Sequence, residues 1–405
     1  MANLKVLMMG GRRCGKTSVL ASMFDQMIHT KEIHELLSVG DQTRPETKIG
    51  IDGIEERQER LDNKCLELKS FLKVYNDAEF LIDKGPTSNY WLYHLQILLA
   101  GTNKDMMIEF RDSNGEFFEF GGQFTTQTEN YLKDCDVYVI VVDTPYLMSE
   151  EDGVPEAANV TDSIHSFLSG MDVNKKKIDA KCVLFVPAKC EYWLHKKEIE
   201  KVKSKIREKY KSTIDFLIQR PNTELAIIPI ETAGDIEFAE LRDALIIRNK
   251  DKEKPVVIKE KDYRGIETEK SYPFVKCSKN TNKIAILPSG LPYALKDDEK
   301  FDLHHESVFQ YGEENLDIPR PFAWYNHRNE HPRYQPKNCE QVTLHILRFM
   351  LNKARKNQTD NDFVQFFRRV FGKITINDLN KTIVEITNKN LIKDNVDGIE
   401  RLKIY

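Results

Sequence analysis

The sequence predicts an α/β fold in which helices cover both faces of a mostly parallel sheet. Three unbroken runs of β-branched and other apolar residues carry this prediction, at Val137–Val142, Cys182–Val186 and Leu225–Ile230. Such runs are typical of strands that are buried on both faces. Helical stretches around 156–170 and 195–218 separate the runs, and this alternation favours parallel pairing through helical crossovers.

The residues before these runs predict the other strands of the sheet. A short apolar strand is expected at Leu4–Met9, followed by two glycines and a helix over about 16–27. Tyr90–Leu99 and Met106–Arg111 predict a hairpin that adds one antiparallel edge to the sheet. Residues 30–50 hold glycine and proline among polar residues, so we expect an irregular loop there.

Two segments depart from the alternation of strand and helix. Residues 53–83 repeat apolar side chains at helical spacing among dense charges, which predicts an inserted helix or helix pair. After residue 250 the chain becomes charged, with short β-like pieces and a proline-containing irregular segment at 310–337. The last expected elements are three helices and a strand, at Cys339–Lys356, Asp360–Val370, Ile376–Lys389 and Ile399–Ile404.

Length, charge and cysteine content narrow the class of protein. The 405 residues are enough for two or three domains of about 150 residues each. The net charge of −4 gives no general attraction to nucleic acid or anionic membranes, although basic segments at 175–177 and 195–211 leave nucleic-acid contact open. The seven cysteines lack zinc-ligand or redox spacing, and no apolar run has the roughly 18 residues of a membrane span. We therefore expect a soluble protein of the reducing cytoplasm.

The segment from Gly10 to Thr17 carries the clearest chemical signal. Its pattern, Gly-x-x-x-x-Gly-Lys-Thr between a strand and a helix, is that of a P-loop. The glycines let backbone N–H groups point at a phosphate, Lys16 reaches the β- and γ-phosphates, and Thr17 gives a hydroxyl to Mg²⁺. The helix N-terminus adds its positive dipole end. We expect these residues to bind a nucleoside triphosphate: Gly10, Gly11, Arg12, Arg13, Cys14, Gly15, Lys16, Thr17 and Ser18.

The P-loop makes the predicted fold that of a P-loop NTPase, a Rossmann-like arrangement of three layers. We place the P-loop domain at 1–248, with the helical insert at 53–83, and an α+β accessory region at 249–405. This division places the P-loop in the first of the two regions.

A second motif, Asp112-Ser113-Asn114-Gly115, follows the expected strand at Met106–Arg111. Asp-x-x-Gly at this place is the entry to switch II in GTPases. Asp112 would hold the magnesium shell through water, and the Gly115 amide would sense the γ-phosphate. A further hydroxyl ligand for the metal is expected before the strand at 90–99, where Thr87 is the first candidate and Ser88 and Thr43 are alternatives.

Base recognition is expected after the strand at Cys182–Val186, where Ala188-Lys189-Cys190-Glu191 stands in the place of Asn-Lys-x-Asp. Lys189 would pack its stem on a purine face, and Glu191 would accept the N1 and N2 protons of guanine. Ala188 cannot make the contacts of the missing asparagine. Thr232 and Ala233 follow the strand at 225–230 and would touch the base through their backbone.

Together these motifs resemble a GTPase of the TRAFAC class over about residues 1–245. Within that class, the long insert, the Lys-Cys-acidic sequence and the helix that begins near Cys339 are similar to the bacterial double-GTPase families of conflict and defence systems. The resemblance implies a switch that binds GTP and GDP with Mg²⁺ and serves antiviral defence. It also implies a protein partner: an operon-encoded effector or regulator, or a second copy of the chain.

Hydrolysis requires an aligned water and positive charge near the γ-phosphate. Glu116, directly after Asp-x-x-Gly, and Gln123 are the candidates to align the water. Arg13 resembles the arginine of guanylate-binding proteins that becomes an internal finger on dimerisation, and we expect it to supply the charge when a partner covers the site. The alternative is that Arg12 and Arg13 both face solvent.

Two alternatives to a GTPase remain open from the sequence. Ala188 and Glu116 favour a nucleotide-stabilised scaffold that hydrolyses little, and Ala188 also permits an ATPase. Cys14 lies beside the helix N-terminus, so its thiol is expected to have a lowered pKa, which would allow redox control. Otherwise Cys14 is a small spacer in the loop.

Overall fold

The structure is a computed structural model. The residues that it describes are 4–11, 14–43, 46–49, 55–58, 60–74, 79–80, 90–100, 105–113, 115, 118, 131–170, 181–221, 223–242, 245–248, 256–261, 267–272, 283–286, 292–295, 322–329, 333–356 and 375–403.

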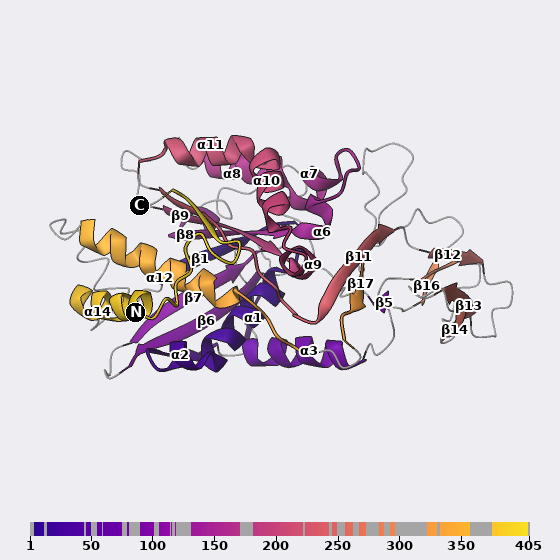
Figure 1. The fold of residues 1–405 in the computed structure, drawn as a ribbon, viewed down its shortest axis with the longest axis horizontal. Coiled ribbons are helices and arrows are strands. Elements are labelled where there is room, and N and C mark those ends of the chain that lie inside the picture. The colour runs from indigo at the N-terminus through magenta and orange to yellow at the C-terminus, as the bar shows by residue number, and fades with distance from the viewer. Residues whose placement is uncertain are drawn as a thin grey trace.

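A ten-stranded sheet forms the centre of the described chain (Figure 1), with the strand order β18-β10-β9-β8-β1-β7-β6-β4-β3 and with β2 also paired to β6. Its strands are β1 (Leu4–Met9), β2 (Leu37–Asp41), β3 (Glu46–Ile49), β4 (Glu55–Gln58), β6 (Tyr90–Leu99), β7 (Asp105–Asp112), β8 (Val137–Asp143), β9 (Lys181–Ala188), β10 (Thr223–Ile227) and β18 (Glu400–Lys403). The five strands from β7 to β10 in this order are parallel, as the sequence predicts.

Strand β1 lies between β7 and β8 and pairs parallel with both. The strand order of the sheet therefore reverses at β1. Such a point of reversal opens a crevice at the carboxyl ends of the strands, where α/β proteins bind ligands. The segments that follow β1, β7, β8 and β9 therefore meet at one edge. This α/β architecture of a mostly parallel sheet with helices on both faces is the fold class that the sequence predicts.

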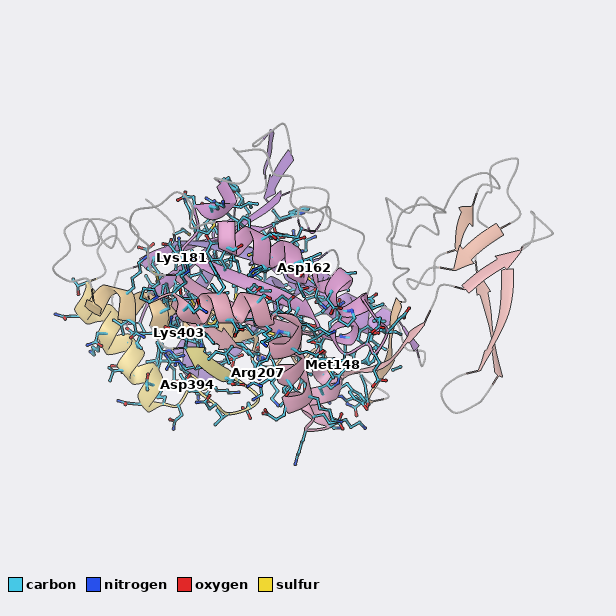
Figure 2. All side chains as sticks on the ribbon, turned by 90° about the horizontal axis from the view of Figure 1, so that it is seen from above. Met148, Asp162, Lys181, Arg207, Asp394 and Lys403 are labelled. Carbon is cyan, nitrogen blue, oxygen red and sulfur yellow. The ribbon has the colours of Figure 1, made fainter. Side chains whose placement is uncertain are left out.

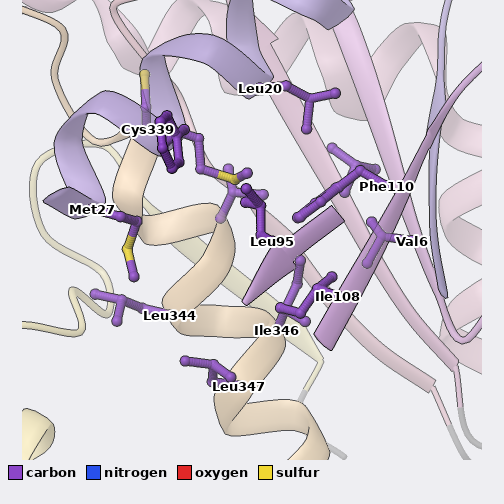
Figure 3. Packing of buried hydrophobic residues seen from close by; sticks show 14 of the residues in the cluster. Val6, Leu20, Met27, Leu95, Ile108, Phe110, Cys339, Leu344, Ile346 and Leu347 are labelled. Atoms are coloured by element: carbon purple, nitrogen blue, oxygen red, sulfur yellow. The ribbon is translucent and has the colours of Figure 1, made fainter. Parts of the chain in front are cut away.

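Alternate side chains of β1 enter two separate cores, because successive residues of a strand point to opposite faces. Val6 packs with α1 (Lys16–His29), α3 (Leu61–Val74) and α12 (Cys339–Lys356). Figure 3 shows part of this core, with Ile346 of α12 pointing toward the strand that carries Ile108 and Leu344 on the side of Met27 of α1. Leu7 packs with the helices of the other face, which are α8 (Thr161–Gly170), α10 (Ile199–Lys209) and α11 (Lys211–Gln219).

The prediction of an irregular loop over 30–50 is wrong. A short helix, α2 (Lys31–His34), leads into β2, which pairs antiparallel with β6, and β3 pairs with β4. In β2 the side chains of Leu37, Val39 and Asp41 are buried while Ser38 is exposed. Pairing with β6 supplies the backbone hydrogen bonds, so the local preference of Gly40 for a turn is overridden.

The antiparallel pair β6–β7 is confirmed, but β6 is not at the edge of the sheet, because β2 and β4 both pair with it. The insert expected at 53–83 holds the helix α3, preceded by β4 and followed by the two-residue strand β5 (Glu79–Phe80). Helix α3 packs on α1, and Leu61, Cys65 and Leu68 enter the same core as Val6.

The C-terminal part of the chain completes the central sheet. Helix α12 has the predicted bounds and packs beside α1, while α14 (Ile376–Asn388) packs on α12. Strand β18 pairs antiparallel with β10 at the sheet edge, close to the predicted 399–404. The helix expected at 360–370 lies outside the described residues.

Between β10 and α12 the chain makes a long excursion. Strands β11 (Ile236–Arg242) and β17 (Phe322–His327) pair antiparallel, and we call this pair the stem. Strand β5 adds to β17 through Phe80 and Tyr325. The described strands beyond the stem are antiparallel, namely β12 (Leu245–Arg248) with β15 (Lys283–Ile286), β16 (Pro292–Leu295) with β15, and β13 (Val256–Lys261) with β14 (Glu267–Tyr272). Among the described helices, none has both the length and the apolar character to cross a membrane.

A buried polar cluster joins α12, β10 and β18 away from the P-loop. His345 of α12 is fully buried, its Nδ1 lies 3.0 Å from Arg348 Nη2, and its Nε2 lies 3.2 Å from the Lys393 carbonyl. Since the guanidinium can only donate, Nδ1 accepts and Nε2 carries the proton. Burial, and then the charge of Arg348, lower the pKa of His345 to about 3. Glu224 lies beside both Arg348 and Arg401 in the same cluster.

Within this cluster, the buried His345 predicts a loss of stability in acid. Below about pH 6.5 the unfolded chain protonates His345, while the folded chain does not until about pH 3, so folding becomes less favourable as pH falls. Each unit of pKa difference corresponds to about 1.4 kcal/mol. The measurement is the free energy of unfolding in urea at pH 7 and at pH 5. In the parent, His345 is expected to contribute about 2 kcal/mol to the difference between these two values, and His345→Gln is expected to remove that contribution. His34→Gln, at an exposed histidine, is the control; an equal pH dependence in parent and His345→Gln would contradict the assignment.

Candidate functional site

The loop after β1 folds so tightly that its glycines are required. Gly10 has φ +146°, and a Cβ on it would lie 2.5 Å from the Val141 carbonyl oxygen. A Cβ on Gly11 would overlap the Ala158 carbonyl oxygen, and Gly15, at the N-cap of α1, has φ +96°. These are backbone conformations and close approaches that side chains oppose. Arg12 and Arg13 lie outside the described residues.

The Lys16 side chain extends back from the start of α1 toward the first residues of this loop. Its ammonium Nζ donates to the carbonyl oxygens of Gly10 at 3.1 Å and Gly11 at 3.0 Å, and the side chain is buried. Backbone carbonyls are neutral acceptors, whereas phosphate oxygens form shorter and stronger charge-assisted hydrogen bonds with an ammonium. The lysine is therefore held at the loop by contacts that an anion can replace. Ser18, two residues further on, is half-buried in the first turn of α1.

Thr17 and Asp112 meet where α1 begins and β7 ends. The pairing of β1 with β7 sets Asp112 beside Met8, and Thr17 Oγ1 donates to Asp112 Oδ2 at 2.5 Å. The other carboxylate oxygen, Oδ1, is buried without a hydrogen-bond partner among the described residues. Burial raises the pKa of Asp112, and Lys16 and the Thr17 hydroxyl oppose this rise.

These two oxygens fit a magnesium ion. A hydroxyl and a carboxylate side by side are the hard donors that Mg²⁺ prefers, and Mg²⁺ keeps further positions for water and phosphate oxygens. A buried carboxylate oxygen without a partner is costly unless a cation or donor reaches it. Thr17 and Asp112 would therefore hold the ion, and its charge would offset that of the phosphates.

The other residues predicted around the phosphates are only partly described. Ser113 Oγ donates to the Met8 carbonyl oxygen at 2.6 Å and fixes the start of the Asp-x-x-Gly turn. Gly115 is buried and its carbonyl accepts from Phe118 N at 3.0 Å. Thr43 Oγ1 accepts from His94 N at 2.9 Å, which places this hydroxyl in the β2–β6 ladder. The remaining predicted residues, Thr87, Ser88, Glu116 and Gln123, lie outside the described part of the chain.

The prediction of a lowered pKa for Cys14 is wrong. The thiol is fully buried, and burial raises its pKa, with the charge of Lys16 as the largest opposing effect. Its sulfur lies where a Cβ on Gly10 would come within 2.7 Å. Desolvation outweighs the helix dipole because no water reaches the sulfur. Cys14 thus fills space beneath the loop, and its burial does not favour redox control.

Lys189 lies over the end of the P-loop and is paired with an aspartate that the sequence analysis missed. Its backbone is left-handed, with φ 59°, and its Cε lies 3.9 Å from the position of a Cβ on Gly15. Its Nζ donates to Asp143 Oδ2 at 2.5 Å, and both side chains are largely buried. An acidic residue directly after the apolar run 137–142 was the available signal, because parallel neighbouring strands end at the same edge.

Glu191 and the Thr232–Ala233 segment, both predicted to contact the base, also contact each other. Glu191 Oε1 accepts from the N–H groups of Thr232 at 2.8 Å and Ala233 at 3.0 Å. Glu191 Oε2 is buried, with no hydrogen-bond partner in the described part of the structure. Burial raises the pKa of Glu191, and the two amides oppose that rise. The longer side chain of glutamate thus reaches the loop that would otherwise offer its amides to a base.

A second carboxyl group beside Glu191 and Thr232, that of Glu231, was also missed by the sequence analysis. It precedes Thr232, and its backbone pairs with Lys337 through hydrogen bonds of 3.0 and 2.9 Å. Burial, and then the neighbouring Glu191, raise the pKa of Glu231 to about 7. Lys337 and Arg328 oppose the rise. Its position at the end of an apolar run, as for Asp143, was the signal in the sequence.

The basic stretch over 195–211 is largely neutralised by neighbouring acids on α10 and around it. Lys203 pairs with Glu200, and Lys209 pairs with Glu156 across to α7 (Val154–Asn159). Arg207, which Figure 2 labels, pairs with Glu400 of β18. Paired surface charges of this kind offer little net attraction to a phosphate backbone.

Comparisons with known proteins give the chain no family. No protein-family model matches it, and no curated protein matches it. Among solved structures, a complex titled signal recognition particle receptor SRb-GTP/SRX from Chaetomium thermophilum is similar, with 10% identity, 58% of this chain and 93% of that chain covered, and a TM-score of 0.28. The GTPase-like domain of Ski7 from S. cerevisiae is similar in its GTP-bound form, with 12% identity, 80% and 75% coverage and a TM-score of 0.30. The same domain bound to GDP and inorganic phosphate gives 11% identity, 80% and 75% coverage and a TM-score of 0.30.

The proximity of Thr17 and Asp112 predicts that nucleotide affinity depends on Mg²⁺ through the Thr17 hydroxyl. Thr17→Val keeps the size of the side chain and removes the oxygen. Its affinity for a fluorescent GTP analogue with Mg²⁺ is expected to fall by at least about tenfold, the usual order for disturbing a metal's environment. With EDTA the two proteins are expected to bind alike.

The matched control is Thr382→Val in α14, whose hydroxyl donates to its own helix backbone at Asp378. It should keep the full magnesium effect. A Thr17→Val protein in which Mg²⁺ raises affinity as much as in the parent would exclude Thr17 as a ligand.

Proposed function

We propose that the chain is a GTP-binding and GTP-hydrolysing switch. The observation that carries the proposal is the cluster of Lys16, Thr17 and Asp112 at the end of β1 and β7. A buried lysine whose ammonium donates to the loop carbonyls, and a carboxylate with one buried oxygen that has no partner among the described residues, suit a triphosphate with its magnesium ion. The glycine loop leaves room for backbone alone, as a phosphate cradle requires.

The choice of guanine rests on the corner formed by Lys189, Glu191 and Thr232–Ala233. Lys189 extends over the P-loop, where the face of a purine attached to the bound phosphates would lie. Glu191 supplies a carboxylate that prefers the N–H donors of guanine to the acceptor edge of adenine. To accept them, Glu191 must expose Oε2 or release one of the two amides that its Oε1 now holds.

We further propose that the nucleotide state controls protein partners, with Mg²⁺ as cofactor. The support for this role is the resemblance to bacterial double-GTPase families of defence systems, which implies an operon-encoded effector, a regulator or a second copy of the chain. The ion pairs along α10 favour a protein partner over a nucleic acid.

A second candidate is a nucleotide-stabilised scaffold that hydrolyses little. The observation that favours it is the closed state of the base corner, in which Glu191 is buried and bonded to Thr232 and Ala233. Ala188 lies at the end of β9, where its carbonyl oxygen accepts from the Thr144 hydroxyl at 2.5 Å. Ala188 lacks the side-chain amide of the asparagine in the usual guanine motif, so an ATPase is also compatible with this site.

Single-turnover release of phosphate from GTP and from ATP separates these candidates. A GTPase switch is expected to release phosphate faster from GTP, and Lys16→Ala is expected to slow release by about a hundredfold or more, because a charged contact to the transferring group is lost. Lys133→Ala is the matched control, since Lys133 Nζ also donates to a backbone carbonyl, that of Gly170 at 3.0 Å.

Tight binding of GTP without phosphate release would favour the scaffold, and faster release from ATP would favour the ATPase. Equal rates for Lys16→Ala and the parent would exclude the P-loop as the site of reaction.

The internal arginine is tested by the dependence of GTP turnover on protein concentration. If Arg13 becomes a finger when a second copy covers the site, turnover per molecule rises with concentration and falls by about 10³–10⁵ in Arg13→Ala. Arg12→Ala, at the neighbouring loop arginine, is the control and should keep the concentration dependence. A parent rate that is independent of concentration would rule out the finger.

A further inference from the structure

We propose that Arg328, at the end of the stem, is a positioning residue for base recognition. This inference rests on the proposed function, because it concerns the base corner of the same nucleotide site. It adds that the corner is completed by a residue of the 236–332 excursion, which has no nucleotide motif of its own.

The stem begins where the base loop ends. Thr232 and Ala233 are followed by Gly234 and Asp235, and β11 starts at Ile236. Gly234 has φ +97°, and a Cβ there would lie 2.5 Å from the Gln335 carbonyl oxygen. The loop therefore turns sharply and runs directly into the stem.

The stem also packs on the helix that carries Glu191. Trp193 of α9 (Glu191–His195) stacks on Phe238 of β11, with ring centroids 5.4 Å apart and an angle of 20°. Phe238 then meets Tyr325 of β17 edge to face at 6.2 Å. Trp193 and Tyr325 are buried, so this aromatic contact fixes the stem against α9.

Arg328 bridges the two halves of the corner. Its guanidinium Nη2 donates to the Glu191 carbonyl oxygen at 2.9 Å, and its own backbone N–H donates to the Asp235 carbonyl oxygen at 3.1 Å. Inside the corner, the Glu191 side chain bridges the same two segments through its bonds to Thr232 and Ala233. The Arg328 guanidinium also opposes the raised pKa of Glu231.

Two bridges therefore hold α9 against the Thr232–Ala233 loop. The inner bridge is the Glu191 side chain, and the outer bridge is Arg328. A base that takes Glu191 Oε1 competes with the inner bridge, because that oxygen now accepts from the loop amides of Thr232 and Ala233. The outer bridge through Arg328 uses a backbone carbonyl, and a base does not compete for it. Arg328 thus keeps α9 and the loop together while Glu191 changes partners.

The experiment compares the affinities of GTP and inorganic tripolyphosphate, which has the phosphates without the base. In Arg328→Ala, the dissociation constant for GTP is expected to rise by about tenfold, the order for losing a charge-assisted hydrogen bond. The constant for tripolyphosphate is expected to stay within about twofold, since the P-loop is unchanged. Arg328→Lys keeps one donor and the charge, so it is expected to lose less GTP affinity than the alanine variant.

Arg333→Ala is the matched control. Arg333 is an exposed arginine of the same connection, and its contact with Asp235 uses its backbone N–H at 3.0 Å, which alanine retains. It should change neither affinity. Melting temperatures of all variants without ligand show how far each substitution disturbs the fold.

Equal losses for GTP and tripolyphosphate in Arg328→Ala would overturn the proposal, since they indicate a structural role only. Unchanged GTP affinity would overturn it as well. Should the alanine variant not fold, the ratio of the two constants in Arg328→Lys decides, and a ratio equal to that of the parent overturns the proposal. A parent that binds neither ligand, or binds both equally, would instead contradict the proposed function.

Discussion

The parallel pairing of β1 with β7 is the interaction on which the candidate site depends. It aligns Met8 with Asp112, so the P-loop and the Asp-x-x-Gly turn leave the sheet at the same edge. Thr17, at the start of α1, then meets Asp112 at 2.5 Å. A shift of one residue in this register would turn Asp112 to the other face of the sheet. The geometry of the magnesium position is therefore a property of strand pairing as much as of the motifs.

The sheet that carries this register is completed from the other end of the chain. Helix α12 covers the same face as α1, and β18 pairs with β10 at the edge. Gln26 of α1 binds the start of α12, with its Oε1 accepting from Cys339 N at 2.7 Å. The residues around the P-loop and those after the excursion thus share one core. The excursion leaves and returns between β10 and α12 without interrupting that core.

Sequence patterns predicted the centre of the fold because its strands are buried on both faces and its P-loop requires particular residues. They failed for β2, where pairing with β6 overrides a glycine, and for Cys14, where burial outweighs the helix dipole. Asp143 and Arg328 were missed for a different reason. Each acts through a residue distant in sequence, Asp143 through Lys189 and Arg328 through Glu191. Only the folded chain brings such pairs together.

The base corner differs from the phosphate loop in how it is held. At the P-loop, Gly10 and Gly11 lie so close to the carbonyl oxygens of Val141 and Ala158 that neither position has room for a Cβ. The corner depends on hydrogen bonds of Glu191 and Arg328, which can exchange partners at modest cost. A nucleotide would therefore find a preformed site for its phosphates and an adjustable one for its base. Because the adjustable part continues into the stem, and β17 of the stem pairs with β5, the proposed base binding would act on the excursion through these contacts.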